Sequence, residues 1–494
     1  KRGTHLPLIV EPLQVGFIVI TQNFPPCHRL AQCWIRRQMV RWPNLTAVLQ
    51  LLALHKSVIG DDVVRWPVRL ALHTEQFRGV EGNALQGTVA AGFTVDVAVG
   101  TPPQQLTLFV DTGSSDVAIA SYPERNLTTY FDTNKSATYK SNGEHVSKRF
   151  VEGSYGGTVG SDVLQDRAGN LALRVALVAI SSSADMFPNQ SHWQGLLGLA
   201  FPALSKQTSF MQVLDTQKGI KHLELSPCTR EKTSTFDKIG ILEFGGRVSE
   251  ATAYTAVVRE TYFEIALLDI RIGHHVWPGS CTELNRSPVI VDSGTTDLKF
   301  PRPVFNWMFD TLGSLGIYNL SQDARTVYCL EDGFVTAGFP DVHLHFPDSN
   351  GKVFELELTP EVYFQRVKVT TGDRACYKLG IGASELGTVI GFNVLRKLHT
   401  VFDLENKRVG FSKLHCAKGG VGVVYTNYSY TGHSCAWDFV TMEDNAWTIL
   451  LYVLIFIVVM CAIPSTVILF IWIRKKVRIY RARTTTEGVG LVDF

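Results

Sequence analysis

Two short acidic motifs, one in each half of the chain, contain the residues best suited to chemistry. The triplet Asp-Thr-Gly at 111–113 recurs 181 residues later as Asp-Ser-Gly at 292–294. Each copy ends an apolar run that is typical of a buried strand. A single Asp-Thr-Gly is an ordinary turn, but two copies in matching contexts indicate a duplicated lobe. The repeat therefore predicts that Asp111 and Asp292 form a catalytic pair, with one carboxylate from each half.

Two facing carboxyl groups that share one proton can activate water and protonate a leaving group without a metal or a covalent nucleophile. Like charges about 3 Å apart cannot both ionise, so the pair would titrate in two separated steps. Gly113 and Gly294 leave room for backbone N–H groups beside the carboxylates. The hydroxyl residues after the two glycines, Ser114 and Thr295, could donate hydrogen bonds to the outer carboxylate oxygens. The hydroxyl residues before the glycines, Thr112 and Ser293, could join the two loops to each other.

The elements that must position these motifs read mostly as strands. Valine- and aromatic-rich runs are interrupted by turn residues, including 41 glycines, and long amphipathic helical patterns are few. A chain of 494 residues exceeds one ordinary domain. The halves match again at 193–198 and 388–391, where each places a small glycine behind an acidic motif. The sequence predicts a mainly β, bilobal fold. With a formal charge of only +2 and no basic stripe, nucleic acid is not an expected partner.

A long uncharged stretch lies near the C-terminus. Residues 447–473 carry no charge over 27 positions. As a helix this is about 40 Å, against a bilayer core of about 30 Å. Six Lys and Arg residues follow it, whereas Glu443 and Asp444 precede it. This bias predicts a single-pass type I membrane protein with residues 474–494 in the cytosol. A buried core helix is the alternative, and the flanking charges disfavour it.

Six cysteines lie between residue 57 and the uncharged stretch, an even number that fits disulfides in an oxidising compartment, although sequence alone leaves their pairing open. The chain contains no Cys-x-x-Cys spacing, so we expect no metal site and no cofactor. A further sequon at Asn285 is weakened by Pro288. Glycosylation is expected at five sequons after the signal-like segment: Asn126, Asn134, Asn189, Asn319 and Asn427.

The N-terminal 56 residues divide at the first methionine. Residues 1–38 show no periodicity, and Met39 precedes a basic residue and an apolar run typical of a signal peptide. We expect translation to start at Met39; a divergent N-terminal extension is the alternative. Residues 57–85 are basic, apolar and rich in turns. They would be either a linker or a propeptide that covers an acidic cleft.

On these motifs the chain resembles the pepsin-like aspartic proteases, and within them the membrane-anchored beta-secretase (memapsin) group. The resemblance covers about residues 86–476. Its motifs are Val-Gly-Thr-Pro-Pro-Gln at 99–104, Val-Asp-Thr-Gly-Ser-Ser at 110–115, Trp-Gln-Gly-Leu-Leu-Gly-Leu-Ala at 193–200, Val-Asp-Ser-Gly-Thr-Thr at 291–296, and the last strands at 401–403 and 408–411.

The resemblance implies an aspartic endopeptidase, made as a zymogen, that cleaves lumenal or extracellular segments of membrane glycoproteins in the Golgi, in endosomes and at the cell surface. Together with the seam near residue 223, it gives lobes at 86–223 and 224–438 and a stalk at 439–446. It implies the disulfides Cys228–Cys416, Cys281–Cys435 and Cys329–Cys376. It also implies a flap near 145–160 and a set of substrate contacts, namely Phe150, Val151, Glu152, Gly153 and Lys299.

Several positions depart from that group. Phe150 stands where the family has the flap tyrosine, Lys299 replaces an arginine, and Asp116 and Asp297 replace the Asn after each motif. Because of these departures, one alternative is a catalytically weak or inactive glycoprotein that acts in binding or sorting. A soluble protease joined wrongly to a membrane segment is the other alternative.

Overall fold

In the computed structural model, the described residues all lie in one compact unit, residues 61–494. The expected signal segment and the start at Met39 therefore lie outside the described residues. The described residues are 63–79, 84–124, 126–150, 153–167, 169, 171–188, 191–227, 239–315, 320–323, 325–330, 338–369, 375–414, 420–429, 435, 451, 453–457 and 468–478.

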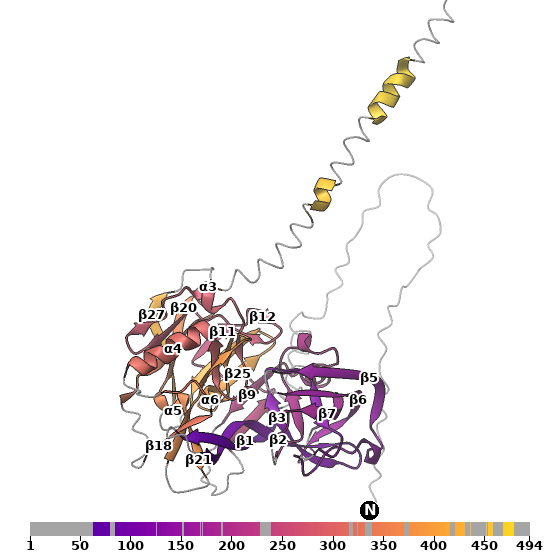
Figure 1. Cartoon of the computed structure of the whole chain (residues 1–494). Coiled ribbons are helices and arrows are strands. Elements are labelled where there is room, and N and C mark those ends of the chain that lie inside the picture. Colours follow the sequence, from indigo (N-terminus) through magenta and orange to yellow (C-terminus); the bar gives the residue numbers. More distant parts are fainter. Residues whose placement is uncertain are drawn as a thin grey trace, which may run out of the picture. The chain divides into compact units, whose positions relative to one another are not determined.

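Strands dominate the described part of the chain, where they form three sheets (Figure 1). The largest has 16 strands, in the spatial order β11 (Ala253–Ala256), β26 (Arg408–Lys413), β25 (Leu398–Asp403), β9 (His222–Ser226), β10 (Gly240–Phe244), β1 (Val64–Gly79), β18 (Thr326–Leu330), β22 (Ala375–Leu379), β21 (Phe364–Val369), β2 (Ala84–Val99), β3 (Gln104–Asp111), β8 (Gly195–Gly198), β4 (Val117–Ala120), β7 (Ala172–Ala184), β6 (Ser154–Asp166) and β5 (Lys140–Arg149).

Two smaller sheets lie in the C-terminal half. One contains β12 (Arg259–Glu260), β13 (Phe263–Glu264), β16 (Val289–Val291), β24 (Thr388–Ile390), β17 (Leu298–Pro301) and β23 (Ile381–Ser384). The other contains β15 (His275–Val276), β14 (Asp269–Ile272), β19 (Val342–Pro347), β20 (Lys352–Leu358) and β27 (Val421–Ser429). The α-helices that lie between these strands are short: α2 (Phe210–Lys218), α3 (Cys281–Leu284), α4 (Arg302–Ser314), α5 (Pro360–Tyr363) and α6 (Phe392–Leu395).

The strand arrangement behind each acidic motif is repeated. In the N-terminal half β3 pairs parallel with β8, which pairs antiparallel with β4. In the C-terminal half β16 pairs parallel with β24, which pairs antiparallel with β17. A Cβ on Gly198 would lie 2.6 Å from the backbone N of Asp116, and one on Gly391 would lie 2.3 Å from the backbone O of Asp297. Both glycines therefore permit the close crossing of chain segments that the sequence predicts.

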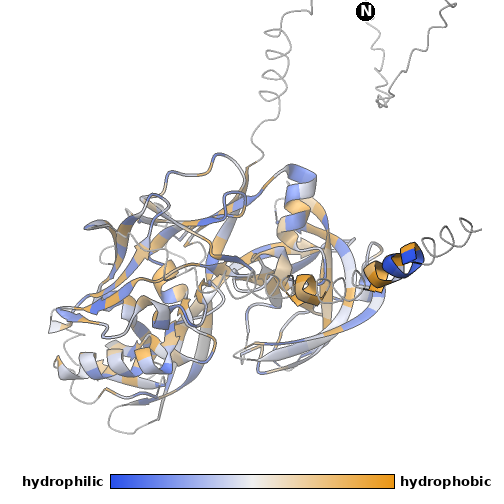
Figure 2. Ribbon diagram, turned by 90° about the horizontal axis from the view of Figure 1, so that it is seen from above, coloured by the Kyte–Doolittle hydropathy of each residue, from blue (hydrophilic) through white to orange (hydrophobic). Residues whose placement is uncertain are grey.

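The segment at 57–85 contributes a central strand. Residues 64–68 of β1 pair with β10, and residues 68–78 pair with β2. Trp66 is 2% exposed and packs against Phe210 and Phe244, with ring centroids 5.7 and 5.2 Å away. In Figure 2 hydrophobic and hydrophilic segments alternate along the strands, as expected for strands with one buried face.

Two of the three expected disulfides are present. Cys281, at the start of α3, bonds to Cys435, with Cα atoms 5.4 Å apart. Cys329 of β18 bonds to Cys376 of β22, its direct neighbour in the sheet, with Cα atoms 4.1 Å apart. The expected pair Cys228–Cys416 lies outside the described residues.

The expected membrane span at 447–473 is described only at 451, 453–457 and 468–473, which are helical. Figure 2 shows the last described helix, residues 468–478, changing from hydrophobic to hydrophilic along its length. Among the described residues, no helix has both the length and the apolar character needed to cross a membrane.

Candidate active site

Asp111 ends β3 and Asp292 directly follows β16, so the two acids occupy equivalent places in the repeated strand arrangement. Each side chain is 7% exposed. A Cβ on Gly113 would lie 2.6 Å from the Asp292 carboxyl, and one on Gly294 would lie 2.3 Å from Oδ1 of Asp111. Because each glycine faces the opposite carboxyl, the fold brings the two acids face to face.

Each carboxyl is held by its own motif. The N–H of Gly113 donates to Oδ1 of Asp111 at 2.8 Å, and the N–H of Gly294 donates to Oδ1 of Asp292 at 2.7 Å. The other oxygen of each acid accepts a bond from a hydroxyl, Ser114 Oγ at 2.5 Å and Thr295 Oγ1 at 2.7 Å. The two loops thus fix their carboxyl groups in the same way.

Thr112 and Ser293 join the two loops through reciprocal, buried hydrogen bonds. Thr112 Oγ1 donates to the carbonyl of Val291 at 3.0 Å, and Ser293 Oγ donates to the carbonyl of Val110 at 2.7 Å. Each hydroxyl also accepts the backbone N–H of the other residue, at 3.1 and 2.9 Å. Four bonds across the interface therefore fix one carboxyl relative to the other.

The electrostatics of this site favour one retained proton. The pKa of the Asp111 carboxyl is raised to about 7, first by burial and then by the neighbouring charge of Asp292 and a hydrogen bond to it, whereas the bonds from Ser114 and Gly113 oppose the rise. A carboxyl group with this pKa is protonated at mildly acidic pH, as an acid catalyst must be.

The sequence matches the eukaryotic aspartyl protease family over residues 92–414, which include both acidic motifs. The chain belongs to this family. It is 30% identical to a beta-secretase of Strongylocentrotus purpuratus over 431 residues, covering 78% of this chain and 80% of the relative. It is 25% identical to human gastricsin over 334 residues, covering 65% and 81%, and 25% identical to aspartic protease 1 of Caenorhabditis elegans over 341 residues, covering 64% and 81%.

Family membership makes this chain an aspartic endopeptidase. The aspartyl protease has a cavity of about 760 Å³ beside the two acids. One wall is apolar and contains Phe109, Met186, Trp193 and Leu196. Charged side chains also line the cavity: Arg149, Asp185, Lys299, Arg302 and Glu385. A cavity of this size and mixed lining fits several consecutive side chains of an extended peptide.

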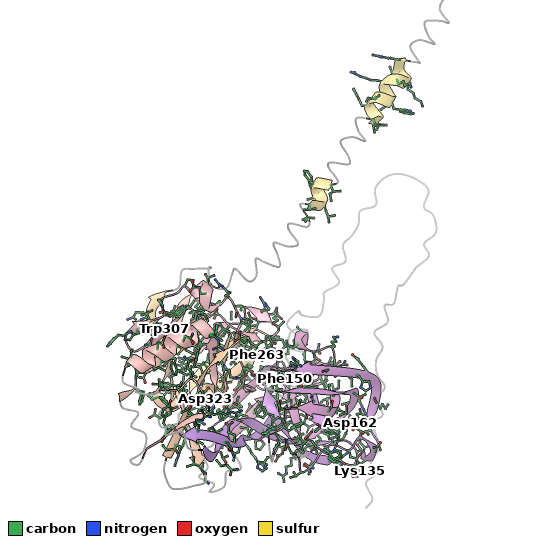
Figure 3. All side chains as sticks on the ribbon, viewed as in Figure 1. Lys135, Phe150, Asp162, Phe263, Trp307 and Asp323 are labelled. Carbon is green, nitrogen blue, oxygen red and sulfur yellow. A yellow bond between two sulfur atoms is a disulfide. The ribbon has the colours of Figure 1, made fainter. Side chains whose placement is uncertain are left out.

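The segment expected to be the flap lies in the hairpin of β5 and β6. Phe150, labelled in Figure 3, lines the cavity at the end of β5, and Lys299 lines it from β17. Gly153 lies at the turn with a φ of 86°, and a Cβ there would lie 2.8 Å from the carbonyl oxygen of Asp185, so glycine is required. The expected contacts Val151 and Glu152 lie outside the described residues.

Sequence reasoning missed part of the cavity wall. Ala71 and Leu72 of β1 line it, although the segment was expected to be only a linker or propeptide. Tyr262, between β12 and β13, also lines it. No local sequence motif predicts that β1 or Tyr262 lines the cavity, since this depends on which segments lie beside the loops of Asp111 and Asp292.

The expected glycosylation sites differ in accessibility. Asn134 and Asn427 are exposed, whereas Asn126 is half-buried and donates from Nδ2 to the carbonyl of Phe187 at 3.0 Å. Asn189 and Asn319 lie outside the described residues. The weak sequon at Asn285 is buried, and its amide bonds the carbonyls of Leu267 and Cys281, both at 2.7 Å, so no glycan fits there.

Proposed function

We propose that the chain is a membrane-anchored, beta-secretase-like endopeptidase in which Asp111 and Asp292 are the catalytic pair. The observation that carries the proposal is the reciprocal placement of each carboxyl against the opposite glycine. The raised pKa of Asp111 supports it, because the pair then holds one proton at mildly acidic pH. Ser114 and Thr295 orient the outer oxygens, and Thr112 and Ser293 fix the separation of the loops.

The reaction uses both protonation states of the pair. The ionised carboxyl takes a proton from a water molecule as the water oxygen attacks the peptide carbonyl carbon. The protonated carboxyl donates its proton to the carbonyl oxygen, which gives a neutral tetrahedral intermediate. The intermediate then collapses: the carboxyl that took the proton from water gives it to the nitrogen as the C–N bond breaks, and the other carboxyl takes a proton from a hydroxyl of the intermediate. A carboxylic acid and an amine are released, and the pair again holds one proton. Because the two carboxyls share one proton, the roles of acid and base are assigned to the pair and not to one residue each.

The uncharged stretch at 447–473, with six cations after it, supports anchorage as a single-pass type I protein with residues 474–494 in the cytosol. Similarity to a beta-secretase along most of the chain supports the same architecture. Anchorage would keep the cavity near other membrane proteins and raise their effective concentration. The substrates we propose are exposed peptide segments of membrane glycoproteins, in the Golgi, in endosomes and at the cell surface. Extraction tests the anchor: the protein should need detergent, and release by a salt wash alone would contradict it.

The remaining segments follow the same proposal. Residues 86–223 and 224–438 are the two lobes, 439–446 the stalk, and residues up to 85 carry the signal and propeptide-like segments. A propeptide that contains β1 would also supply an internal strand of the largest sheet.

The direct test is Asp292→Asn in the full chain, assayed with a quenched peptide library at about pH 5. Asp310→Asn, an exposed acid on α4, is the matched control. We expect cleavage to be lost in the first variant and retained in the second, with both chains folded and disulfide-bonded. If the wild-type chain binds a statine-type inhibitor but cleaves no peptide, the protein is instead a binding or sorting glycoprotein that kept the cleft.

A further inference from the structure

Two more buried acids repeat between the lobes. Asp116 follows Asp111 by five positions, and Asp297 follows Asp292 by the same five. Asp116 is 8% exposed and Asp297 is 9% exposed. An isolated buried carboxylate is costly, so each acid must have a partner that offsets its charge.

Asp116 holds three chain segments together. Its Oδ2 forms an ion pair with Lys148 Nζ from β5 and accepts a bond from the Tyr155 hydroxyl of β6 at 3.4 Å. Its Oδ1 accepts a bond from Ser205 Oγ. Lys148 also donates to the carbonyl of Leu204 at 3.1 Å. The catalytic loop, the flap hairpin and the 202–205 turn therefore meet at one carboxylate.

Asp297 makes a matching set of contacts. Lys378 Nζ lies 3.0 and 2.9 Å from its two oxygens, and Gln365 Nε2 donates to Oδ1 at 2.7 Å. Lys378 and Gln365 lie directly opposite each other in the hairpin of β21 and β22. Lys148 and Tyr155 likewise lie opposite each other in the hairpin of β5 and β6. In each lobe, two side chains that lie opposite each other in one hairpin thus bind the buried acid through an ion pair and a hydrogen bond.

The two hairpins differ in what they reach. Tyr155 packs on Phe150, with ring centroids 5.8 Å apart, and Phe150 lines the cavity beside the two acids. Within the described residues of the other hairpin, 364–369 and 375–379, no side chain lines that cavity. Of the two ion pairs, therefore, the one in the N-terminal lobe is the one that, among the described residues, connects a catalytic loop to a segment lining the cleft.

We propose that Lys148 is a positioning residue, whose ion pair with Asp116 holds the flap strand at the height over the cleft that substrate binding needs. The inference rests on the proposed function of Asp111 and Asp292. The Asp297–Lys378 pair is its structural counterpart, and it stabilises the C-terminal lobe without acting on substrate. The physical reason is that the Asp116 side chain is buried whereas that of Lys148 keeps 30% exposure, so the carboxylate has its opposite charge beside it only when the flap strand is docked on the catalytic loop.

The test replaces each pair by neutral residues in the full, detergent-solubilised chain. Asp116→Asn with Lys148→Met removes both charges, leaves an amide that can bond Ser205 and Tyr155, and creates no unpaired buried charge. Asp297→Asn with Lys378→Met makes the same change in the other lobe. We expect KM of the first double variant to rise on the order of tenfold with a smaller change in kcat. KM of the second should stay at the wild-type value.

Lys148→Arg provides the rescue, because it keeps the positive charge and should keep the wild-type KM. Thermal unfolding of all variants separates stability from positioning. A wild-type KM in the Asp116→Asn, Lys148→Met chain would overturn the inference, and so would an equal rise in KM in the Asp297→Asn, Lys378→Met chain. Absence of cleavage by the wild-type chain would instead count against the proposed function itself.

Discussion

At the residue scale, each dyad carboxyl receives one backbone N–H and one hydroxyl, and the remaining interaction is the one between the two acids. Hydrogen bonds to a carboxylate favour its ionised form, whereas burial and a second negative charge oppose it. For Asp111 the opposing causes win, and its pKa rises to about 7. The site therefore favours the state in which one of the two carboxyl groups is protonated over the state in which both are ionised.

Cleavage should depend on pH with a definite sign. Since the pKa of Asp111 is raised to about 7, its proton is present below that pH and is lost as pH rises through it. We expect kcat/KM to be high in mildly acidic solution and to fall about tenfold for each pH unit above the pKa. Initial rates with a quenched peptide across the pH range would measure this. Rates that keep rising above neutral pH would contradict the assignment of the proton to this pair.

Gly294→Ala should strongly reduce cleavage by steric means alone. The added Cβ would lie 2.3 Å from Oδ1 of Asp111, a distance at which one of the two groups must move. We expect a loss on the order of 100-fold in kcat/KM, because small displacements of reacting groups are costly. Gly313→Ala is the control, since a Cβ there meets nothing within 4 Å. Comparable losses in both variants would show that folding, and not dyad geometry, is affected.

At the element scale, the repeated strand arrangement explains why the duplicated motifs predicted the dyad. A motif that ends a buried strand is fixed by local sequence, so Asp111 and Asp292 could be found without coordinates. The partners of Asp116 could not, because they depend on the register of β5 against β6, which contains a bulge. The role of Leu72 in the cavity wall was likewise hidden, since β1 reaches the cleft only through its pairing with β2.

We expect residues 64–79 to remain with the folded protein, because β1 is an internal strand whose Trp66 is 2% exposed. Trp66→Ala should lower the free energy of unfolding by about 3–5 kcal/mol through the cavity it leaves. Arg65→Ala, at a neighbouring exposed position, should cost about 1 kcal/mol or less. Denaturant unfolding measures both, and mass spectrometry shows which segments stay bound. A stable, active protein without residues 64–79 would contradict this expectation.

At the scale of the whole molecule, disulfides and loop closure stabilise the C-terminal half. The pairing followed from family resemblance, since cysteine spacing alone left it open, and the two described pairs match it. The Cys281–Cys435 bond spans 154 residues and therefore constrains the unfolded chain strongly.

Replacing Cys281 and Cys435 together by Ser should destabilise the protein by about 2–5 kcal/mol. The dyad lies on other elements, so the peptide-cleaving activity of the folded fraction should persist at low temperature. Thermal unfolding, followed together with residual activity, measures both effects. An unchanged unfolding temperature would show that this bond does not stabilise the protein.

The proposed reaction requires Asp111 and Asp292 to act as one unit across the lobe interface. The most direct measurement is kcat/KM for Asp111→Asn, Asp292→Asn and the double variant, with folding verified for each. We predict that each single substitution removes essentially all cleavage and that the double variant is no worse than either, since paired catalytic groups are not additive. Substantial turnover in either single variant, or losses that multiply in the double variant, would contradict a shared dyad.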